Sequence, residues 1–203
     1  MIRKSKYKVA RKLGPAIFDK TSTQKYAVRA ARRNPVAKKN SRPKTDYGLQ
    51  LLEKQRAKAF YGITEKQFSN YVSAILAQKG VNNNEKLVES LETRLDNVVY
   101  RLGLVNSRQF ARQVVSHGHI RVNGSRVNIP SYKVKVGDKI TIKEGSLKRP
   151  IFATLEEKLK TVNFPSWLNY NPEKKEFNIQ GMPKIVPTEL PFRAAAVFEF
   201  YNR

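Results

Sequence analysis

Apolar residues recur along much of this chain at the spacing of an α-helix, and polar residues mark where each helix begins and ends. Thr45 stands where an N-cap belongs, and the pattern after it predicts a helix that ends at Gly62. Its apolar positions are Leu49, Leu52, Ala59 and Phe60. Its cations, which we expect to face outward, are Lys54, Arg56 and Lys58.

A second helix is predicted to begin at Thr64, because Thr64 and Gln67 have the spacing of a capping box. The pattern ends this helix at Gly80. Its apolar stripe is Phe68, Tyr71, Val72, Ile75 and Leu76, which the helical spacing assigns to a core. We expect the two helices to pack together as a hairpin.

The most informative segment runs from Leu91 to Asn128. Its first half is apolar at Leu91, Leu95, Val98 and Leu102 and predicts a helix that Gly103 ends; with the residues from Leu87 onward, either one bent helix or two abutting helices fit. Ser107 is placed to cap another helix. The expected buried stripe of that helix is Phe110, Ala111, Val114 and Val115.

A small antiparallel sheet is predicted to follow. Ile120 and Val122 alternate with polar residues, and the pair Asn123–Gly124 is a strong hairpin signal. Further alternation over 132–136, a turn at Gly137 and strand formers at 140 and 142 continue the sheet. We therefore expect a module of two helices packed on a small sheet over residues 91–144.

The two ends of the chain are expected to form a separate, mainly helical domain. Residues 1–90 would be completed by 145–203, with an early core of Tyr7, Leu13, Ile17, Phe18 and Tyr26. In the C-terminal part we expect a helix over 153–161, a hairpin of 167–170 with 176–179 and an extended strap around the prolines at 183, 187 and 191. The last segment fits a helix or a strand: Ala194 to Ala196 favour a helix, the expectation we adopt, whereas Val197, Phe198, Phe200 and Tyr201 are strand formers. The fold class is thus α+β.

Charge narrows the class of partner. The chain has 40 Lys and Arg against 16 Asp and Glu, a formal net charge of +24, and 18 of those cations lie at or before Lys58. Such a chain repels itself unless a polyanion neutralises it, so nucleic acid is the default partner. Residues 26–44, rich in arginine with two prolines, are expected to be loop-like and ordered by phosphate contacts, the alternative being a solubilising tail.

Catalysis, metal binding and membrane insertion find little support. There is no cysteine, and His117 and His119 lack partner ligands for zinc. The neighbours Ser116 and His117 point in different directions on a helix and lack an orienting third group. No run approaches a membrane span. We expect no enzyme, no cofactor and no metal.

Two groups of side chains suggest contacts with RNA. Arg94, Asn97 and Arg101 share one helical face, although an internal ion pair of Arg94 with Asp96 is an equal alternative. Arg108, Arg112 and Ser116 align at i, i+4 and i+8 on a stripe expected to face solvent. Arg108 also stands at a helix start, where free N–H groups favour phosphate.

The order of residues resembles a known family. The segments TDYGLQLLEKQRAKAFYG (Thr45 to Gly62), LETRLDNVVYRLG (Leu91 to Gly103) and ARQVVSHGHIRVNG (Ala111 to Gly124) are similar to the bacterial S4 family of the small ribosomal subunit, whose RNA-binding module matches 91–144. Many members hold zinc with four cysteines near the N-terminus, which this sequence lacks. The resemblance implies that the C-terminal tail packs on the first domain and leaves the module as an insertion.

The resemblance also implies a function and partners. The chain would be a structural constituent of the cytoplasmic ribosome that binds a multi-helix junction of 16S ribosomal RNA early in assembly, next to proteins S3 and S5. Its basic segment before Thr45 would face messenger RNA where it enters the subunit and affect accuracy. The RNA-binding residues we predict are Lys38, Lys39, Arg42, Lys44, Lys54, Arg56, Lys58, Arg94, Asn97, Arg101, Ser107, Arg108, Arg112, Ser116, His117, His119, Arg121 and Asn123.

Three alternatives stay open at this point. The module could belong to an RNA-modifying or stress-related protein, as in some pseudouridine synthases, but the flanks are short and basic for a catalytic domain. The chain could also repress its own messenger as a second role. A DNA-compacting protein is the third alternative, and two globular parts argue against it.

Overall fold

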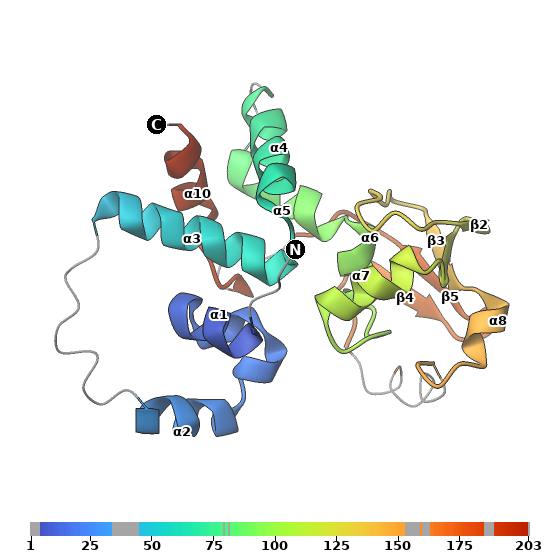
Figure 1. Ribbon diagram of the computed structural model, residues 1–203. Helices are drawn as coiled ribbons and strands as arrows, with labels where there is room; N and C mark the ends of the chain where they lie inside the picture. Colours follow the sequence, from blue (N-terminus) through green and yellow to red (C-terminus); the bar gives the residue numbers. More distant parts are fainter. Residues whose placement is uncertain are drawn as a thin grey trace. The chain divides into compact units, whose positions relative to one another are not determined.

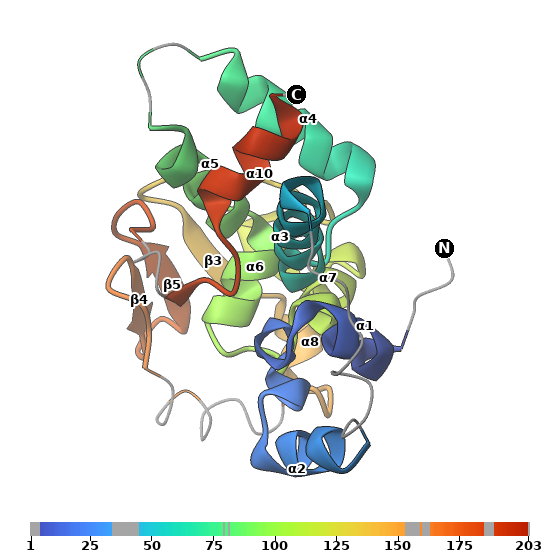
Figure 2. The ribbon, with the colours of Figure 1, turned by 90° about the vertical axis from the view of Figure 1, so that its left-hand side faces the viewer.

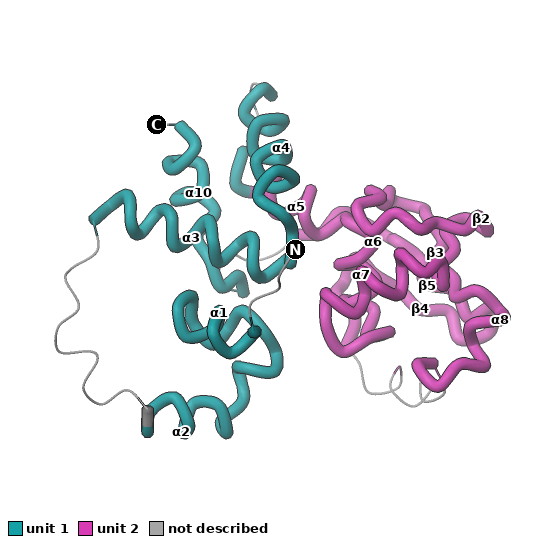
Figure 3. Tube along the Cα trace, viewed as in Figure 1, with its two compact units in different colours: residues 1–84, 185–203 teal, residues 85–184 magenta. Residues whose placement is uncertain are grey.

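The computed structural model describes residues 5–33, 45–78, 80, 82–152, 159, 163–184 and 189–202. The chain forms two compact units (Figures 1 and 3): the first unit is residues 1–84 with 185–203, and the second unit is residues 85–184. The first unit is therefore discontinuous in sequence. The bounds of the first unit differ from the expected 1–90 with 145–203. The main difference is that residues 145–184 belong to the second unit, whose sheet they extend.

The first unit begins with small helical elements. Helix α1 (Lys6–Leu13), two 3₁₀ turns (Pro15–Ile17 and Asp19–Thr21) and α2 (Gln24–Arg33) follow one another. The rings of Tyr7 and Tyr26 stack with centroids 5.9 Å apart, and Ile17 is buried. The expectation of a loop from residue 26 is wrong up to Arg33, because alanines and arginines there are strong helix formers. Residues 34–44, with Lys38, Lys39, Arg42 and Lys44, lie outside the described residues.

Three further helices complete the first unit. Helix α3 (Asp46–Tyr61) is capped by the hydroxyl of Thr45, which accepts from the N–H of Gly48, and ends at Gly62 in the left-handed region. Helix α4 (Glu65–Leu76) is capped by Thr64 and ends four residues before Gly80. Helix α10 (Ala194–Tyr201) confirms the final helix and lies beside α3 in both views (Figures 1 and 2). The main packing partner of α3 is thus α10 rather than the expected α4.

Lys54 does not face outward as expected. It is 7% exposed; its Nζ lies 2.7 Å from Oε1 of Glu65 and 4.1 Å from the centroid of the Phe200 ring. Burial raises the pKa of Glu65, but hydrogen bonds and charge from Lys54 and Lys58 outweigh it and hold this pKa at about 2. Burial and the nearby Glu65 raise the pKa of Tyr201 to about 12. This network joins the start of α4 to α3 and α10.

The second unit contains a five-stranded antiparallel sheet in the order β2-β1-β3-β5-β4. Its strands are β1 (Ile120–Val122), β2 (Ser125–Arg126), β3 (Lys139–Ile142), β4 (Leu168–Asn171) and β5 (Glu176–Ile179). Both expected hairpins are confirmed. Ile140 of β3 pairs with Val122 on one side and with Phe177 on the other, so apolar side chains line one face.

Helices α6 (Leu95–Arg101) and α7 (Arg108–Ser116) pack on this apolar face. The core between them includes Leu95, Val98, Leu102, Val114, Val115, Ile120, Ile140 and Phe177. Phe110 packs at its edge and is only half-buried. Helix α5 (Asn83–Glu92) precedes α6, and the short α8 (Glu144–Leu147) follows β3. The expected helix over 153–161 lies almost wholly outside the described residues, as does part of the proline strap.

The segment expected as a strand over 132–136 is not one. Its backbone bonds instead go to the break between α5 and α6: the N–H of Val134 donates to the carbonyl of Thr93, and the N–H of Leu95 donates to that of Tyr132. Arg94 and Lys133 form an isolated bridge. Of the two open alternatives, two abutting helices is therefore the one that the structure adopts.

Candidate nucleic-acid interface

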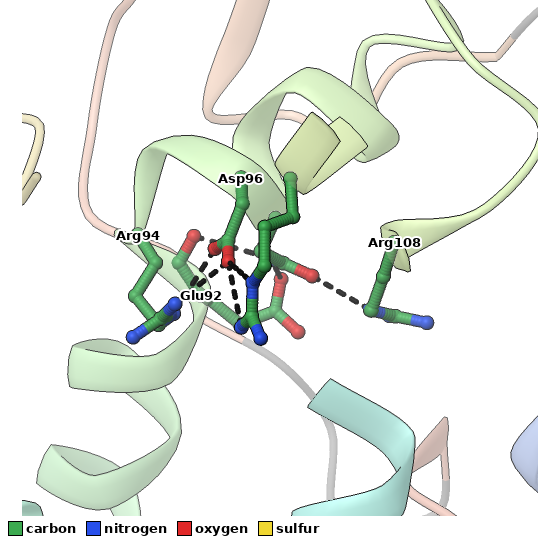
Figure 4. Close-up of polar contacts among 6 residues, drawn as sticks. Glu92, Arg94, Asp96 and Arg108 are labelled. Atoms are coloured by element: carbon green, nitrogen blue, oxygen red, sulfur yellow. Dashed lines mark hydrogen bonds and ion pairs between the residues drawn. The ribbon is translucent and has the colours of Figure 1, made fainter. Parts of the chain in front are cut away.

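The break between α5 and α6 brings charged side chains of three helices together. We call the seven residues Glu92, Arg94, Asp96, Asn97, Arg101, Arg108 and Arg112 the arginine cluster. Glu92 ends α5, Arg94 is the N-cap of α6, and Arg108 and Arg112 come from α7. All seven belong to the second unit. In the view of Figure 4, Arg94 and Arg108 flank Asp96 and Glu92.

Asp96 is the centre of one half of the arginine cluster. Its Oδ1 accepts from Nε of Arg94 at 3.0 Å, and its Oδ2 accepts from Nη2 of Arg94 at 2.6 Å. Oδ2 also accepts from Nε and Nη2 of Arg112 at 3.2 and 3.0 Å. Asp96 is 3% exposed and Arg94 2%, so this is a buried, bidentate pair. The internal ion pair of Arg94, one of the two sequence alternatives, is present.

Glu92 is the centre of the other half. The carboxylate is fully buried and accepts from Nε and Nη2 of Arg101, both at 3.0 Å. The amide of Asn97 donates to Oε2 of Glu92 at 2.6 Å, and its own Oδ1 accepts from Nε of Arg108 at 2.8 Å. The guanidinium of Arg108 lies over the ring of Tyr100, 4.3 Å from its centroid. Asn97 thus connects Glu92 to Arg108.

These contacts change the interpretation of the arginine stripe. Arg108 and Arg112 are half-buried and bonded inside the unit, so the expectation that both simply face solvent is wrong; Ser116 alone of that stripe is exposed. The side chains of Arg101 and Arg112 remain 25% and 22% exposed. Each guanidinium is therefore held by a carboxylate while its side chain stays partly exposed, a geometry suited to a phosphate oxygen.

Sequence reasoning missed Glu92, because nothing in the local pattern distinguishes it from a surface glutamate on α5. Its spacing from Arg101, nine residues across a helix break, is not a helical neighbour spacing. Ser107 caps α7 through the N–H of Phe110, as expected. Asn123, in the left-handed turn of the β1–β2 hairpin, donates to Asp138 at 2.8 Å and accepts from the N–H of Lys139. Its RNA contact stays a prediction.

The two histidines occupy different environments. His119 is 5% exposed, and its Nδ1 lies 2.9 Å from Oγ of Ser146 on α8. Burial lowers the pKa of His119, and the charges of Arg149, His117, Lys143 and Arg126 lower it further. His117 is exposed beside it. Arg121 is half-buried and lies opposite Arg126 across the hairpin.

The candidate cations of α3 are also engaged inside their unit. Nε of Arg56 donates to the carbonyl of Leu13 at 2.7 Å, and its Nη1 donates to Glu53. Lys58 pairs with Glu65 at 2.8 Å. Neither a group of three His, Asp or Glu that could hold a metal nor a helix long and apolar enough to cross a membrane occurs in the described part of the chain.

Comparisons with known proteins agree with this architecture. Residues 2–92 match the ribosomal protein S4/S9 N-terminal domain, and residues 93–140 match the S4 domain. The small ribosomal subunit protein uS4A of Alkaliphilus metalliredigens is 44% identical over 182 residues, 89% of this chain and 87% of the relative. The uS4 protein of Halothermothrix orenii is 47% identical over 159 residues, which are 78% of this chain and 76% of the relative. The uS4 protein of Streptococcus thermophilus strain CNRZ 1066 is 43% identical over 201 residues, which are 97% of this chain and 95% of the relative.

Proposed function

This chain belongs to the uS4 family of small ribosomal subunit proteins, and we propose that it binds a multi-helix junction of 16S ribosomal RNA and nucleates assembly of the subunit around it. Its membership makes it a structural ribosomal protein with an RNA-binding S4 domain, and not an enzyme. The RNA species, the junction and the early binding step are the parts that we propose.

The observation that carries the proposal is the arginine cluster. Two buried carboxylates, Glu92 and Asp96, fix the orientation of arginines on α6 and α7 while Arg101 and Arg112 reach the surface. A guanidinium held in this way loses less side-chain entropy when it binds phosphate. Because the positions of the cations are fixed, the surface fits a folded RNA of definite shape better than an arbitrary polyanion.

We further propose that the first unit contacts messenger RNA where it enters the subunit, next to proteins S3 and S5. The support is the family membership and the basic residues Lys38, Lys39, Arg42 and Lys44. The competing role for the same charges is further contact with ribosomal RNA. Changing the four residues to Ala separates the two roles: impaired translation through a messenger hairpin with normal subunit assembly supports the channel role, and the reverse result excludes it.

Alternatives from other classes are less well supported. An RNA-modifying enzyme that carries the same module would need a separate catalytic domain. In this chain the two family matches together span residues 2–140, and the similarity to uS4 relatives extends over most of their length. Repression of the chain's own messenger is compatible with the proposed function as a second role. It would use the same RNA-binding surface.

Binding to RNA tests the proposal directly. The full chain should bind the 5′ domain of 16S RNA far more tightly than duplex DNA of equal length, and should co-sediment with small subunits. Replacing Arg101 and Arg112 with Gln should weaken RNA binding by about 1–3 kcal/mol. The matched control is Lys133→Gln with Lys135→Gln, two exposed lysines of the same unit. Equal affinity for RNA and DNA would sink the proposal.

A further inference from the structure

A second group of cations lies in the same unit and shares no residue with the arginine cluster. Arg126 of β2, Lys143 before α8 and Arg149 after it are all exposed. Within the described residues none of the three forms an ion pair or a side-chain hydrogen bond, and Glu144, exposed on α8, pairs with none of them. We call these three cations, together with the exposed His117, the basic patch.

His119 brings the members of the basic patch together. Its carbonyl accepts from the N–H of Lys143 at 2.8 Å, and its ring binds Ser146. The N–H of Ser146 donates to the carbonyl of Lys143, and the N–H of Arg149 donates to that of Ser146. The turn that carries both cations is thus fastened to one buried histidine. Ser146 itself is 3% exposed, so this attachment excludes water.

Arg126 reaches the same place from the hairpin. Its guanidinium lies against Gly118, in the position that a Cβ would occupy, and Gly118 has a φ of +70° that favours glycine. The neighbouring Arg121 lies directly opposite Arg126 in the β1–β2 register. Like charges placed opposite each other destabilise a strand pair unless an anion lies between or above them. A bound anion would relieve this repulsion, so the hairpin is more stable with an anion bound than without one.

We propose that His117, Arg126, Lys143 and Arg149 form a second binding site for phosphates of the ribosomal RNA backbone, separate from the arginine cluster. The proposal rests on the proposed function for the identity of the RNA. Its own basis is that three exposed cations, which pair with no carboxylate among the described residues, converge on a buried support. Phosphodiester oxygens are the chemistry that such a group recognises, because they accept hydrogen bonds and supply the missing negative charge.

A triple variant, Arg126→Gln with Lys143→Gln and Arg149→Gln, tests the site in the full chain. The matched control is Lys133→Gln with Lys135→Gln and Lys174→Gln, three exposed lysines of the same unit with the same loss of charge. With the 5′ domain of 16S RNA as probe, the patch variant should lose at least about tenfold in affinity and the control much less. Its slope of log affinity against log salt should fall by about two.

The outcomes separate this site from the proposed function. Equal losses in the two triple variants would mean that only total charge matters, and would overturn the site while RNA binding itself stands. A wild-type chain that binds this RNA no better than duplex DNA would overturn both proposals. Circular dichroism and thermal unfolding check that each variant is folded, and unfolding of the patch variant would make these cations structural and overturn the site.

Discussion

In the arginine cluster each of the four guanidinium groups is hydrogen-bonded to a carboxylate or an amide of the same unit, whereas the three cations of the basic patch meet no carboxylate among the described residues. Both groups come from one unit, and the cluster includes Arg108 and Arg112 of α7 while the patch includes His117, which follows α7. The difference lies in where the negative charge is. Glu92 and Asp96 supply it to the cluster, and the proposed RNA supplies it to the patch.

A cation can therefore stabilise the fold, bind the ligand or do both. A buried carboxylate that holds an arginine contributes little net stability by its presence but costs much when it is removed. An unpaired surface cation destabilises the free protein by repulsion and strengthens its binding to a polyanion. Neutralising the two groups should therefore change stability in opposite directions.

The largest effect is expected from Asp96→Asn. The substitution removes the charge that two arginines contact, one of them only 2% exposed, and should lower the free energy of unfolding by about 3 kcal/mol or more. Glu173→Gln, at an exposed carboxylate of the same unit, is the control and should change it by less than about 0.5 kcal/mol. Chemical denaturation of the full chain measures both. Similar small changes would mean that Asp96 has no electrostatic role in the fold.

A smaller effect distinguishes two arginines of the two groups. Arg112→Gln loses both hydrogen bonds to Asp96 and should destabilise the second unit by about 1–2 kcal/mol, while Arg149→Gln should leave stability within about 0.5 kcal/mol. RNA binding should weaken in both variants. A stable Arg112→Gln chain, or a destabilised Arg149→Gln chain, would contradict the assignment of Arg112 to the fold and of Arg149 to the bound RNA.

The sequence predicted the elements of these regions better than their contacts. Caps at Thr45, Thr64 and Ser107 and the turn at Asn123 were predictable because each depends on residues within four positions. The α+β class followed from the same local signals, whereas the composition of the last segment fitted both a helix and a strand, and the structure shows a helix. The strand expected near Val134 failed because its backbone partners lie about 40 residues earlier, at the helix break.

The candidate site shows the same limit. The arginines of α7 were visible from their i, i+4 spacing, but spacing alone could not show that Asp96 and Asn97 from another helix hold them. Lys54 was expected outside for the same reason, since Glu65, which binds it, lies on the next helix and Phe200, which covers it, lies on the last one. Of the basic patch only His117 was among the predicted RNA-binding residues; Arg126, Lys143 and Arg149 were missed, because they converge only through the tertiary position of His119.

The pH dependence of stability tests the environment of His119. Because burial and then the charge of Arg149 lower its pKa, the unfolded chain takes up this proton at a higher pH than the folded chain. The free energy of unfolding should be constant above about pH 6.5, fall as the pH drops below that value, and level off below the folded pKa. Thermal unfolding between pH 7.5 and 5.5 measures it. His119→Gln should remove the dependence, and His117→Gln, the control, should retain it.

The smallest effect has the opposite sign. Because Arg126, Lys143 and Arg149 have no carboxylate partner within the described residues, replacing all three with Gln should raise the free energy of unfolding by a few tenths of a kcal/mol at low salt. Part of this gain would come from the net charge of +24, and the control triple of Lys133, Lys135 and Lys174 measures that part. The excess over the control is the local repulsion. It should vanish in 1 M salt, where the screening length falls to about 3 Å. Denaturation at low salt and in 1 M salt gives the stability change of each triple variant relative to the wild-type chain. A patch variant that is less stable than its control would show that these cations stabilise the fold.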